Sequence, residues 1–272
     1  MSLTRKEIST IIFTNLTSNK EVLKAQFLKS KATIGYFFID NLLPEELVLE
    51  IYQKFPSTDV SVKRKNLREY KFTAFQMDKY DSLLEEVIYA FQDEKIIKIV
   101  SEICDLESTF GDEHLYAGGL SLMGKDNFLK PHLDNSHDKD INRWRVLNLL
   151  YYVSPEWELE NGGNLELWPN GLKKTPLTIV SKFNRLVVMA THNNSWHSVS
   201  KVNTDAIRCC VSNYYFSEKP LLHTDSFHVT TFRAYPKEKI RDAFLMIDNF
   251  LRSSIRKVLK KGVKKSSHQY KK

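Results

Sequence analysis

Cysteine and long apolar runs are both scarce in this chain of 272 residues. The three cysteines, Cys104, Cys209 and Cys210, form no CxxC pair, which excludes a thiolate zinc site of the usual spacing and argues against a disulfide scaffold. Apolar runs such as 149–153 and 186–190 are far shorter than the roughly 18 residues that a membrane-spanning helix needs. The N-terminus lacks the apolar stretch of a signal peptide, so we expect a cytoplasmic protein.

Acidic residues are absent from the C-terminal segment, although the whole chain carries 40 basic and 33 acidic side chains. Residues 249–272 contain nine lysines and arginines and no acid, which is more than the whole net charge of +7. The remainder, residues 1–248, sums to −2. We therefore expect a near-neutral body with a basic tail, and the net charge of the chain is no evidence for a basic face around an active site.

Helical periodicity dominates the first third of the sequence. Hydrophobic residues make up 42% of the chain and charged residues 27%, which is ordinary for a globular protein with a core. Pro44 opens a predicted helix in which Leu47 and Ile51 recur at a spacing of four. Asp81 or Ser82 can cap a later helix.

From about residue 112 the pattern changes to short runs of Val, Ile, Leu, Tyr and Trp between turn residues. Such runs are typical of an antiparallel sandwich or barrel such as a jelly roll. We therefore predict an α+β fold with one domain over 1–240, in which supporting helices over 1–110 pack on a β-core over about 112–233. The expected strands are 115–123, 144–153, 164–168, 185–190, 195–202, 206–216 and 226–233.

Residues 241–272 are expected to form a C-terminal amphipathic helix followed by the basic tail. The apolar stripe of this helix consists of Phe244, Ile247, Leu251, Ile255, Val258 and Leu259. Two interpretations stay open: the stripe packs on the β-core, or residues 249–272 contact an anionic membrane surface. Contact with nucleic acid is a third and weaker interpretation.

The segment 128–134 carries the strongest chemical signal. Residues i and i+2 of an extended strand point to the same side, so His132 and Asp134 can converge on one point. An imidazole and a carboxylate on one side of a strand are two-thirds of the 2-His-1-carboxylate triad that binds non-haem Fe(II). The alternative is a surface turn, because polar residues follow directly.

The second imidazole must come from another strand. His197 is favoured because it lies in a strand-like run, 196–199, whereas His192 precedes that run. A rival set of ligands in a loop-like stretch consists of His137 with Asp138 or Asp140.

An arginine flanked by apolar residues follows in the next strand-like run. Arg208 lies between Ile207 and Cys209, and a buried guanidinium without an anion is too costly. A carboxylate, which can bind both edges of the guanidinium fork, is its natural partner.

Taken in order, these residues resemble the Fe(II)- and 2-oxoglutarate-dependent oxygenases, especially their prolyl-4-hydroxylase-like branch. The resemblance covers roughly residues 112–217. It implies a double-stranded β-helix, which is a distorted jelly roll like that of the cupins. The motifs that carry it are His132-x-Asp134, Gly162-Gly163-x-Leu165-x-Leu167, Arg185-Leu186-Val187-Val188, Trp196-His197-Ser198-Val199 and Arg208.

The resemblance implies a metal site and a co-substrate site. His132, Asp134 and His197 would bind Fe(II), and Arg208 would bind the distal carboxylate of 2-oxoglutarate. With O2, such an enzyme converts 2-oxoglutarate into succinate and CO2 while it hydroxylates an unactivated C–H bond. Halogenases of the family commonly lack the carboxylate ligand, so the presence of Asp134 favours hydroxylation.

Two departures from the family pattern matter. Some collagen-type prolyl hydroxylases have lysine at the position of Arg208, and many plant-type members have a serine at the position of Cys210. A hydroxyl contact to 2-oxoglutarate must then come from elsewhere, for which Asn148, Tyr152 and Tyr214 are candidates. Nucleic-acid demethylases of the AlkB type carry a second arginine at the position of Tyr214, which argues against a nucleic-acid substrate.

The substrate stays open. A peptidyl or free amino acid, a saccharide or glycolipid, and a small metabolite are all compatible with the resemblance. Two other hypotheses belong to different classes of protein. One is a non-catalytic β-sandwich that docks a partner or a membrane through the basic tail, and the other is a cupin-like hydrolase or isomerase with another metal.

Overall fold

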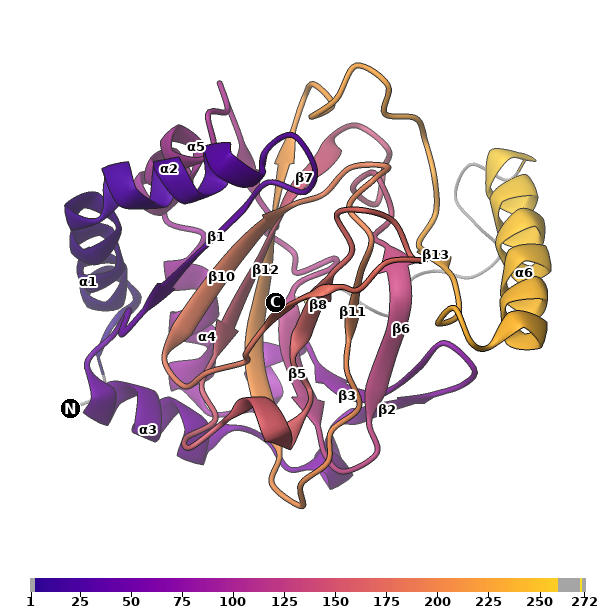
Figure 1. Ribbon diagram of the computed structural model, residues 1–272. Coiled ribbons are helices and arrows are strands. Elements are labelled where there is room, and N and C mark those ends of the chain that lie inside the picture. The colour runs from indigo at the N-terminus through magenta and orange to yellow at the C-terminus, as the bar shows by residue number, and fades with distance from the viewer. Residues whose placement is uncertain (1–2, 259–269, 271–272) are drawn as a thin grey trace.

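The computed structural model describes residues 3–258 and 270, which form α-helices around one β-sheet (Figure 1). The α-helices are α1 (Arg5–Ser18), α2 (Lys20–Ser30), α3 (Glu45–Lys54), α4 (Ser82–Ala90), α5 (Glu94–Ile103) and α6 (Lys239–Val258). The first strands are β1 (Tyr36–Asp40), β2 (Val62–Lys65), β3 (Glu69–Ala74), β4 (Phe110–Gly111), β5 (Gly119–Met123) and β6 (Phe128–Leu133). The others are β7 (Trp144–Tyr152), β8 (Leu165–Leu167), β9 (Leu177–Ile179), β10 (Arg185–Ala190), β11 (His197–Val199), β12 (Arg208–Ser217) and β13 (Thr231–Phe232).

The strands form one curled antiparallel sheet in the order β1-β10-β7-β12-β5-β3-β6-β11-β8-β9. Three further strands lie off this path, since β13 pairs with β6, β2 with β3 and β4 with β12. The sheet bends into a half-barrel, so that β6, β11 and β8 lie across from the longer strands (Figure 1). The predicted double-stranded β-helix with supporting N-terminal helices is confirmed.

The alternation of β7 shows how the sheet separates its two sides. Leu149 and Tyr151 belong to the large core that the sheet shares with the N-terminal helices. Tyr152 packs instead in a smaller cluster inside the half-barrel, and Asn148 lines the cavity there. One side of the strand thus anchors the helices, and the other side lines the barrel interior.

The first third of the chain contains more strand than its helical pattern predicts. The predicted helix after Pro44 is α3, and Asp81 caps α4 by accepting a hydrogen bond from the Leu83 amide. The β2–β3 hairpin, however, was not expected. Residues 62–65 read Val-Lys-Arg-Lys and are largely exposed, so they lack the apolar alternation that identifies a strand.

Helix α6 lies on the other side of the half-barrel from α1–α5, next to β13 and β6 (Figure 1). Its polar side faces the protein. Asp242 forms an ion pair with Arg233, and Asp248 forms one with Arg68 at 2.9 Å. The Asn249 amide accepts from the backbone of Phe232 at 3.0 Å.

The predicted apolar stripe of α6 faces solvent. Phe244 is 63% exposed, Ile247 59%, Leu251 53% and Ile255 45%. The expectation that this stripe packs on the β-core is therefore wrong, because the ion pairs hold the opposite face of the helix. The side chain of Val258, and Leu259 with most of the basic tail, lie outside the described residues.

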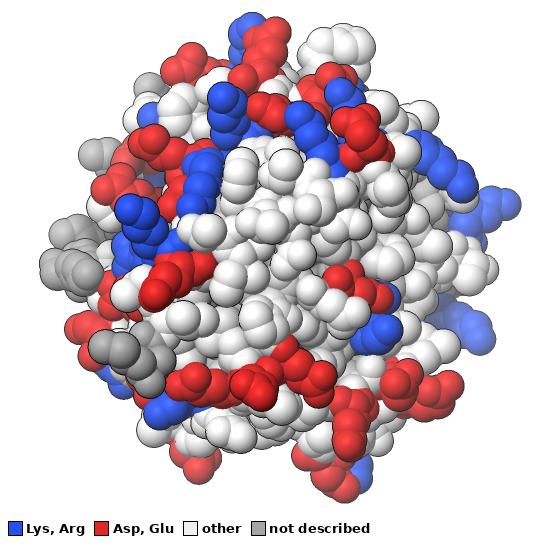
Figure 2. All heavy atoms as spheres, turned by 90° about the vertical axis from the view of Figure 1, so that its left-hand side faces the viewer, with Lys and Arg blue, Asp and Glu red and all other residues white. Residues whose placement is uncertain are grey.

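None of the described helices combines the length and the apolar character that crossing a membrane requires. Figure 2 shows the face that carries α1, α2 and β1, on the side away from α6. Basic and acidic side chains are mixed around the edge of this face, and its middle is uncharged. The positive excess of the chain is not gathered there.

Candidate active site

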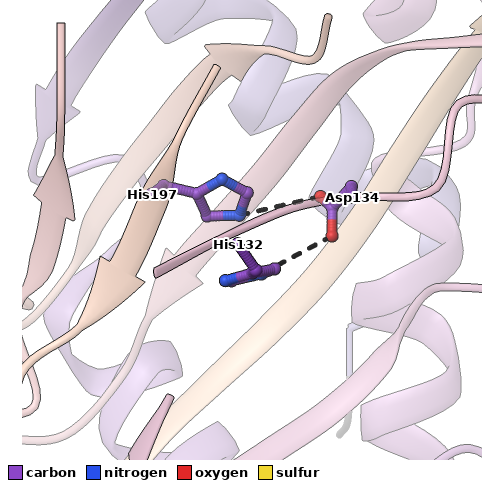
Figure 3. Close-up of side chains that lie close together, drawn as sticks. All are labelled: His132, Asp134 and His197. Atoms are coloured by element: carbon purple, nitrogen blue, oxygen red, sulfur yellow. Dashed lines mark ion pairs between the residues drawn. The ribbon is translucent and has the colours of Figure 1, made fainter. Parts of the chain in front are cut away.

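Three side chains that the sequence singles out converge inside the half-barrel (Figure 3). His132 lies on β6, Asp134 directly follows β6, and His197 begins β11. Nε2 of His132 lies 3.7 Å from Oδ1 of Asp134, and Nε2 of His197 lies 3.7 Å from Oδ2 of the same carboxylate. All three ligand atoms lie within 4.8 Å of one another, and this is the one such group that the described residues form.

Main-chain carbonyls orient both imidazoles. Nδ1 of His132 lies 3.0 Å from the Lys130 carbonyl oxygen, and Nδ1 of His197 lies 2.9 Å from that of Ser195. A ring nitrogen that binds a carbonyl must carry the hydrogen, so each Nε2 keeps its lone pair and faces Asp134. The ring of His132 is also stacked on Phe232, with 5.2 Å between centroids.

The protonation states suit metal binding. Burial, with a smaller contribution from the nearby His197, lowers the pKa of His132 to about 3, so this imidazole is neutral at pH 7. Burial raises the pKa of Asp134, but its interactions with the neighbouring His197 and Arg145 outweigh burial and hold this pKa below its ordinary value. Two imidazoles and one carboxylate are the donor set that non-haem Fe(II) sites use, so the residues fit this metal.

The rival histidines do not reach this point. Nδ1 of His137 forms a hydrogen bond with the neighbouring Ser136 hydroxyl, and the ring of His137 lies against Trp144 and Phe227. Nδ1 of His192 accepts from the Asn194 amide two residues later. Neither belongs to the convergent group.

Arg208 lies 3% exposed on β12, close to β8 and β9 of the opposite side. Its Nε donates to the Ser181 hydroxyl at 3.1 Å, and its guanidinium lies 4.9 Å from the centre of the Tyr152 ring. No carboxylate of the described residues lies within ion-pair distance of it. Arg208 is therefore a buried cation whose anion is not supplied by this part of the chain.

Ser181 is a site residue that the sequence interpretation missed. Its hydroxyl donates to the Gly163 carbonyl at 2.8 Å and is fully buried beside Arg208. It comes from the turn after β9, not from β12, so no fixed spacing from Arg208 reveals it. A hydroxyl next to the arginine is thus present although Cys210 occupies the family's serine position.

Gly163 allows the close approach of Arg208. Its φ is +63°, and a Cβ atom there would lie 3.0 Å from Cδ of Arg208. The glycine pair in the motif therefore has a steric cause, because only glycine adopts this backbone conformation readily and leaves room for the arginine.

The three expected hydroxyl or amide contacts lie in different places. Tyr152 lies beside Arg208, and its hydroxyl has no hydrogen-bond partner among the described residues. Burial raises the pKa of Tyr152 to about 12, so its hydroxyl keeps its proton at pH 7. Asn148 and Tyr214 line the cavity nearer to Asp134, with Nδ2 of Asn148 3.5 Å from the carboxylate.

A cavity of about 410 Å³ lies beside the triad and Arg208. Its lining includes the triad, Arg208 and a further set of basic side chains: Arg64, Arg68, Lys71, Arg145 and Arg252. The net charge of −2 over residues 1–248 gave no sign of this set, because a sum over the body does not report where charges lie. A basic face is present around the site, although the net charge was no evidence for it.

Arg145 could have been found by the reasoning that found Arg208. It follows Trp144 and precedes Val146 on a strand-like run, so it too is an arginine flanked by apolar residues. Lys71 and Arg64 carried no such signal, because the hairpin that presents them was not recognisable as strand.

Comparison with known proteins agrees with this geometry. Residues 118–216 match the model of the 2OG-Fe(II) oxygenase superfamily. No curated protein matched the chain.

Several solved structures share the fold. A Pseudomonas putida prolyl-4-hydroxylase aligns with a TM-score of 0.54 and 16% identity, covering 72% of this chain and all of that one. A prolyl 4-hydroxylase of Phytophthora capsici aligns with a TM-score of 0.57 and 18% identity, covering 95% and 80%. HygX from Streptomyces hygroscopicus, solved with nickel, 2-oxoglutarate and hygromycin B, aligns with a TM-score of 0.51 and 12% identity, covering 71% and 86%.

The fold and the triad define the class of a non-haem iron oxygenase built on a double-stranded β-helix. Within that class, the segment 118–216 belongs to the 2OG-Fe(II) oxygenase superfamily. The predicted family, the class of enzyme and its cofactors, Fe(II), 2-oxoglutarate and O2, are confirmed at this level.

Proposed function

We propose that this protein hydroxylates an unactivated C–H bond of its substrate. In the balanced reaction, substrate C–H, 2-oxoglutarate and O2 give substrate C–OH, succinate and CO2. The observation that carries the proposal is the convergence of the His132–Asp134–His197 triad in one cavity with Arg208, a buried arginine that lacks an anion.

The chain's own residues bind and orient. His132 and His197 hold the metal through Nε2, and Asp134 holds it through its carboxylate. Bound Fe(II) supplies the activation of O2 that side chains cannot provide. Arg208 binds the distal carboxylate of 2-oxoglutarate, and Ser181 fixes the guanidinium from the other side. The Tyr152 hydroxyl has no hydrogen-bond partner among the described residues and can donate to the same carboxylate.

Apolar side chains limit water around the triad. Leu129, Leu150, Leu165 and Val199 line the cavity, and Phe232 covers one ring of the triad. Exclusion of water strengthens the charge interactions of the site and protects reactive species from side reactions.

Succinate formation from 2-oxoglutarate with added Fe(II) tests the proposal. We expect turnover for the wild type, none for Asp134→Ala, and strongly reduced turnover for Arg208→Ala at limiting 2-oxoglutarate. His137→Ala is the matched control, because His137 is a buried histidine of the same region that faces away from the triad. Equal succinate formation by the wild type and Asp134→Ala would contradict the proposal.

A second proposal concerns where the enzyme acts: we infer that α6 docks on an anionic membrane surface. Support comes from the seven large apolar residues that face solvent on this helix: Ile240, Phe244, Met246, Ile247, Phe250, Leu251 and Ile255. The adjoining sequence 249–272 holds nine basic residues and no acid, which anionic lipid attracts. A second copy of the chain is a poorer partner, because pairing through α6 brings two such basic segments together.

Flotation with vesicles of phosphatidylcholine, with and without 30% phosphatidylglycerol, tests this docking. We expect binding only to the anionic vesicles, and its loss in the double variant Phe244→Ser/Phe250→Ser. Val22→Ser is the control, since Val22 is 62% exposed on α2, on the other side of the molecule. Dimerisation in solution that the double variant abolishes, without vesicle binding, would contradict the proposal.

A further inference from the structure

Charge is distributed unevenly in the cavity of the candidate active site. Its lining holds six basic residues and two acidic ones, Glu69 and Asp134. In the proposed enzyme, Asp134 is committed to the metal and Arg208 to 2-oxoglutarate. The two positive charges of Fe(II) and the two negative charges of 2-oxoglutarate cancel. Bound together, they therefore add no net negative charge to balance the other five basic side chains.

Neighbouring acids neutralise only part of this set. Lys71 lies 3.4 Å from Glu69. Arg68 and Arg252 share the single carboxylate of Asp248, each at 2.9 Å. About three positive charges therefore remain around the cavity once these pairs are counted.

Arg64 and Arg145 contribute most directly to that excess. Nε of Arg64 donates to the Thr73 hydroxyl at 3.3 Å, and none of the described carboxylates pairs with this guanidinium. Both side chains line the cavity, although they come from different segments, β2 and β7. Two arginines from separate strands facing one space can bind one anion between them.

Arg145 is the most informative member. It is 5% exposed, and its Nε has no hydrogen-bond partner among the described residues. Its guanidinium lies 4.3 Å from the centre of the Tyr214 ring. The carboxylate nearest to it is that of Asp134, at 3.8 Å, which is too long for a hydrogen bond and is committed to the metal. A buried guanidinium in this position lacks an anion of its own.

The proposed function assigns the distal carboxylate of 2-oxoglutarate to Arg208 and not to Arg145. Arg208 lies against Tyr152 at the end of β7, whereas Arg145 stands near its beginning. Tyr152 lies seven positions further along the strand than Arg145, which is roughly 23 Å of backbone. One small dicarboxylate that chelates the metal and binds Arg208 therefore leaves Arg145 for another molecule.

We propose that the substrate carries a phosphate group, which Arg145 binds together with Arg64 and Lys71. This inference rests on the oxygenase function proposed above and names the substrate class of the same site. A phosphate monoester brings nearly two negative charges and three acceptor oxygens, which match several cationic donors better than one carboxylate does. The phosphate belongs either to a free phosphorylated metabolite or to a lipid headgroup, and α6, which contributes Arg252 to the cavity, adjoins the surface proposed to meet lipid.

Calorimetric titration of glycerol 3-phosphate into the protein loaded with Ni(II) and 2-oxoglutarate tests the proposal, with glycerol as the neutral probe. We expect saturable binding of the phosphate, weakening with salt, and no binding of glycerol. Arg145→Gln and Arg64→Gln should each lower the affinity at least fivefold. Lys65→Gln is the matched control, because it removes one positive charge from the same strand at an exposed residue that does not line the cavity.

The wild-type titration is repeated with vesicles that contain phosphatidic acid, whose headgroup is a phosphate monoester. Competition by the vesicles identifies a lipid headgroup as the source, whereas unchanged binding identifies a free metabolite. Absence of phosphate binding, equal binding of glycerol, or equal affinity of Arg64→Gln and the wild type overturns the proposal. Prior titrations of Ni(II) and 2-oxoglutarate separate the two proposals, since a protein that binds both but no phosphate retains the oxygenase function.

Discussion

His132 lies directly opposite His197 in the antiparallel pair of β6 and β11, with 4.1 Å between the ring centroids. Each Nδ1 binds the carbonyl of the residue two positions earlier in the chain, which is Lys130 for His132 and Ser195 for His197. The register of the two strands and these local hydrogen bonds therefore fix both Nε2 atoms before any metal binds. The carboxylate of Asp134 completes the site from the end of the same strand as His132.

Removal of the carboxylate should strongly weaken metal binding. We expect Asp134→Ala to lower the affinity for Mn(II), used as a stable substitute for Fe(II), by about 100-fold or more, because the loss of an outer-shell partner alone costs roughly 10- to 100-fold. Electron paramagnetic resonance of free Mn(II) measures this affinity. His137→Ala should bind as the wild type does, and a comparable loss in this control would place the metal elsewhere.

Arg208 and Ser181 should affect the co-substrate and not the metal. Arg208→Met removes a charged hydrogen-bonding partner, worth about 1.5–3 kcal/mol, so we expect 2-oxoglutarate to bind roughly 10- to 100-fold more weakly. Ser181→Ala, which only frees the guanidinium, should weaken binding by about three- to tenfold. Titration of the Mn(II)-loaded protein measures both effects, and unchanged affinity in Arg208→Met would refute the assigned role.

Gly163 should tolerate alanine less well than Gly171. Both glycines have a positive φ, +63° at Gly163 and +80° at Gly171. A Cβ atom at Gly163 would lie 3.0 Å from side-chain atoms of Arg208 and Val202, whereas a Cβ atom at Gly171 would have no neighbouring atom within 4 Å. We expect Gly171→Ala to cost about 1 kcal/mol of unfolding free energy from backbone strain, and Gly163→Ala about 2–3 kcal/mol. Urea denaturation measures the difference. Equal losses would show that the arginine is not confined by this glycine.

The pair of Asp40 and Arg185 should make stability depend on pH in the acid range. Arg185 donates to both carboxylate oxygens, at 2.6 and 2.9 Å, and these hydrogen bonds hold the pKa of Asp40 below its ordinary value. A lowered folded-state pKa stabilises the protein above the unfolded pKa of about 4, and this stabilisation disappears as the pH falls through the folded pKa. We expect Asp40→Asn to lose about 1 kcal/mol at pH 7, after allowance for solvent screening, and to approach the wild type below pH 3.

Urea denaturation at several pH values checks this dependence. Glu107→Gln is the matched control, because its ion pair with Lys219 is exposed on both sides and should not change the measured stability. A stability difference between Asp40→Asn and the wild type that stays constant from pH 7 to pH 3 would contradict the explanation.

The sequence predicted the triad because its chemistry depends on local spacing. The i, i+2 geometry of His132 and Asp134 needs only an extended backbone, and His197 lies in a run that reads as strand. Arg208 was predicted from the cost of a buried guanidinium, and the same reasoning applies to Arg145. Ser181 was not predictable, because its contact with Arg208 depends on how two distant strands face each other across the half-barrel.

The orientation of α6 also lay beyond the sequence. Amphipathicity shows that the helix has two faces but not which one the protein binds. Ion pairs with Arg68 and Arg233, which lie on other segments, decide that the polar face turns inward. The β2–β3 hairpin stayed hidden for a related reason, since its exposed polar strand β2 pairs with β3, which in turn pairs with β5, and has no apolar face of its own.

A crystal structure of the protein with Mn(II) and 2-oxoglutarate bound tests the central claim most directly. We predict anomalous density for one metal ion, ligated by Nε2 of His132, Nε2 of His197 and the Asp134 carboxylate, with the distal carboxylate of 2-oxoglutarate on Arg208. Metal density at His137 or His192, or a co-substrate carboxylate bound to Arg145 with Arg208 left free, would contradict the account.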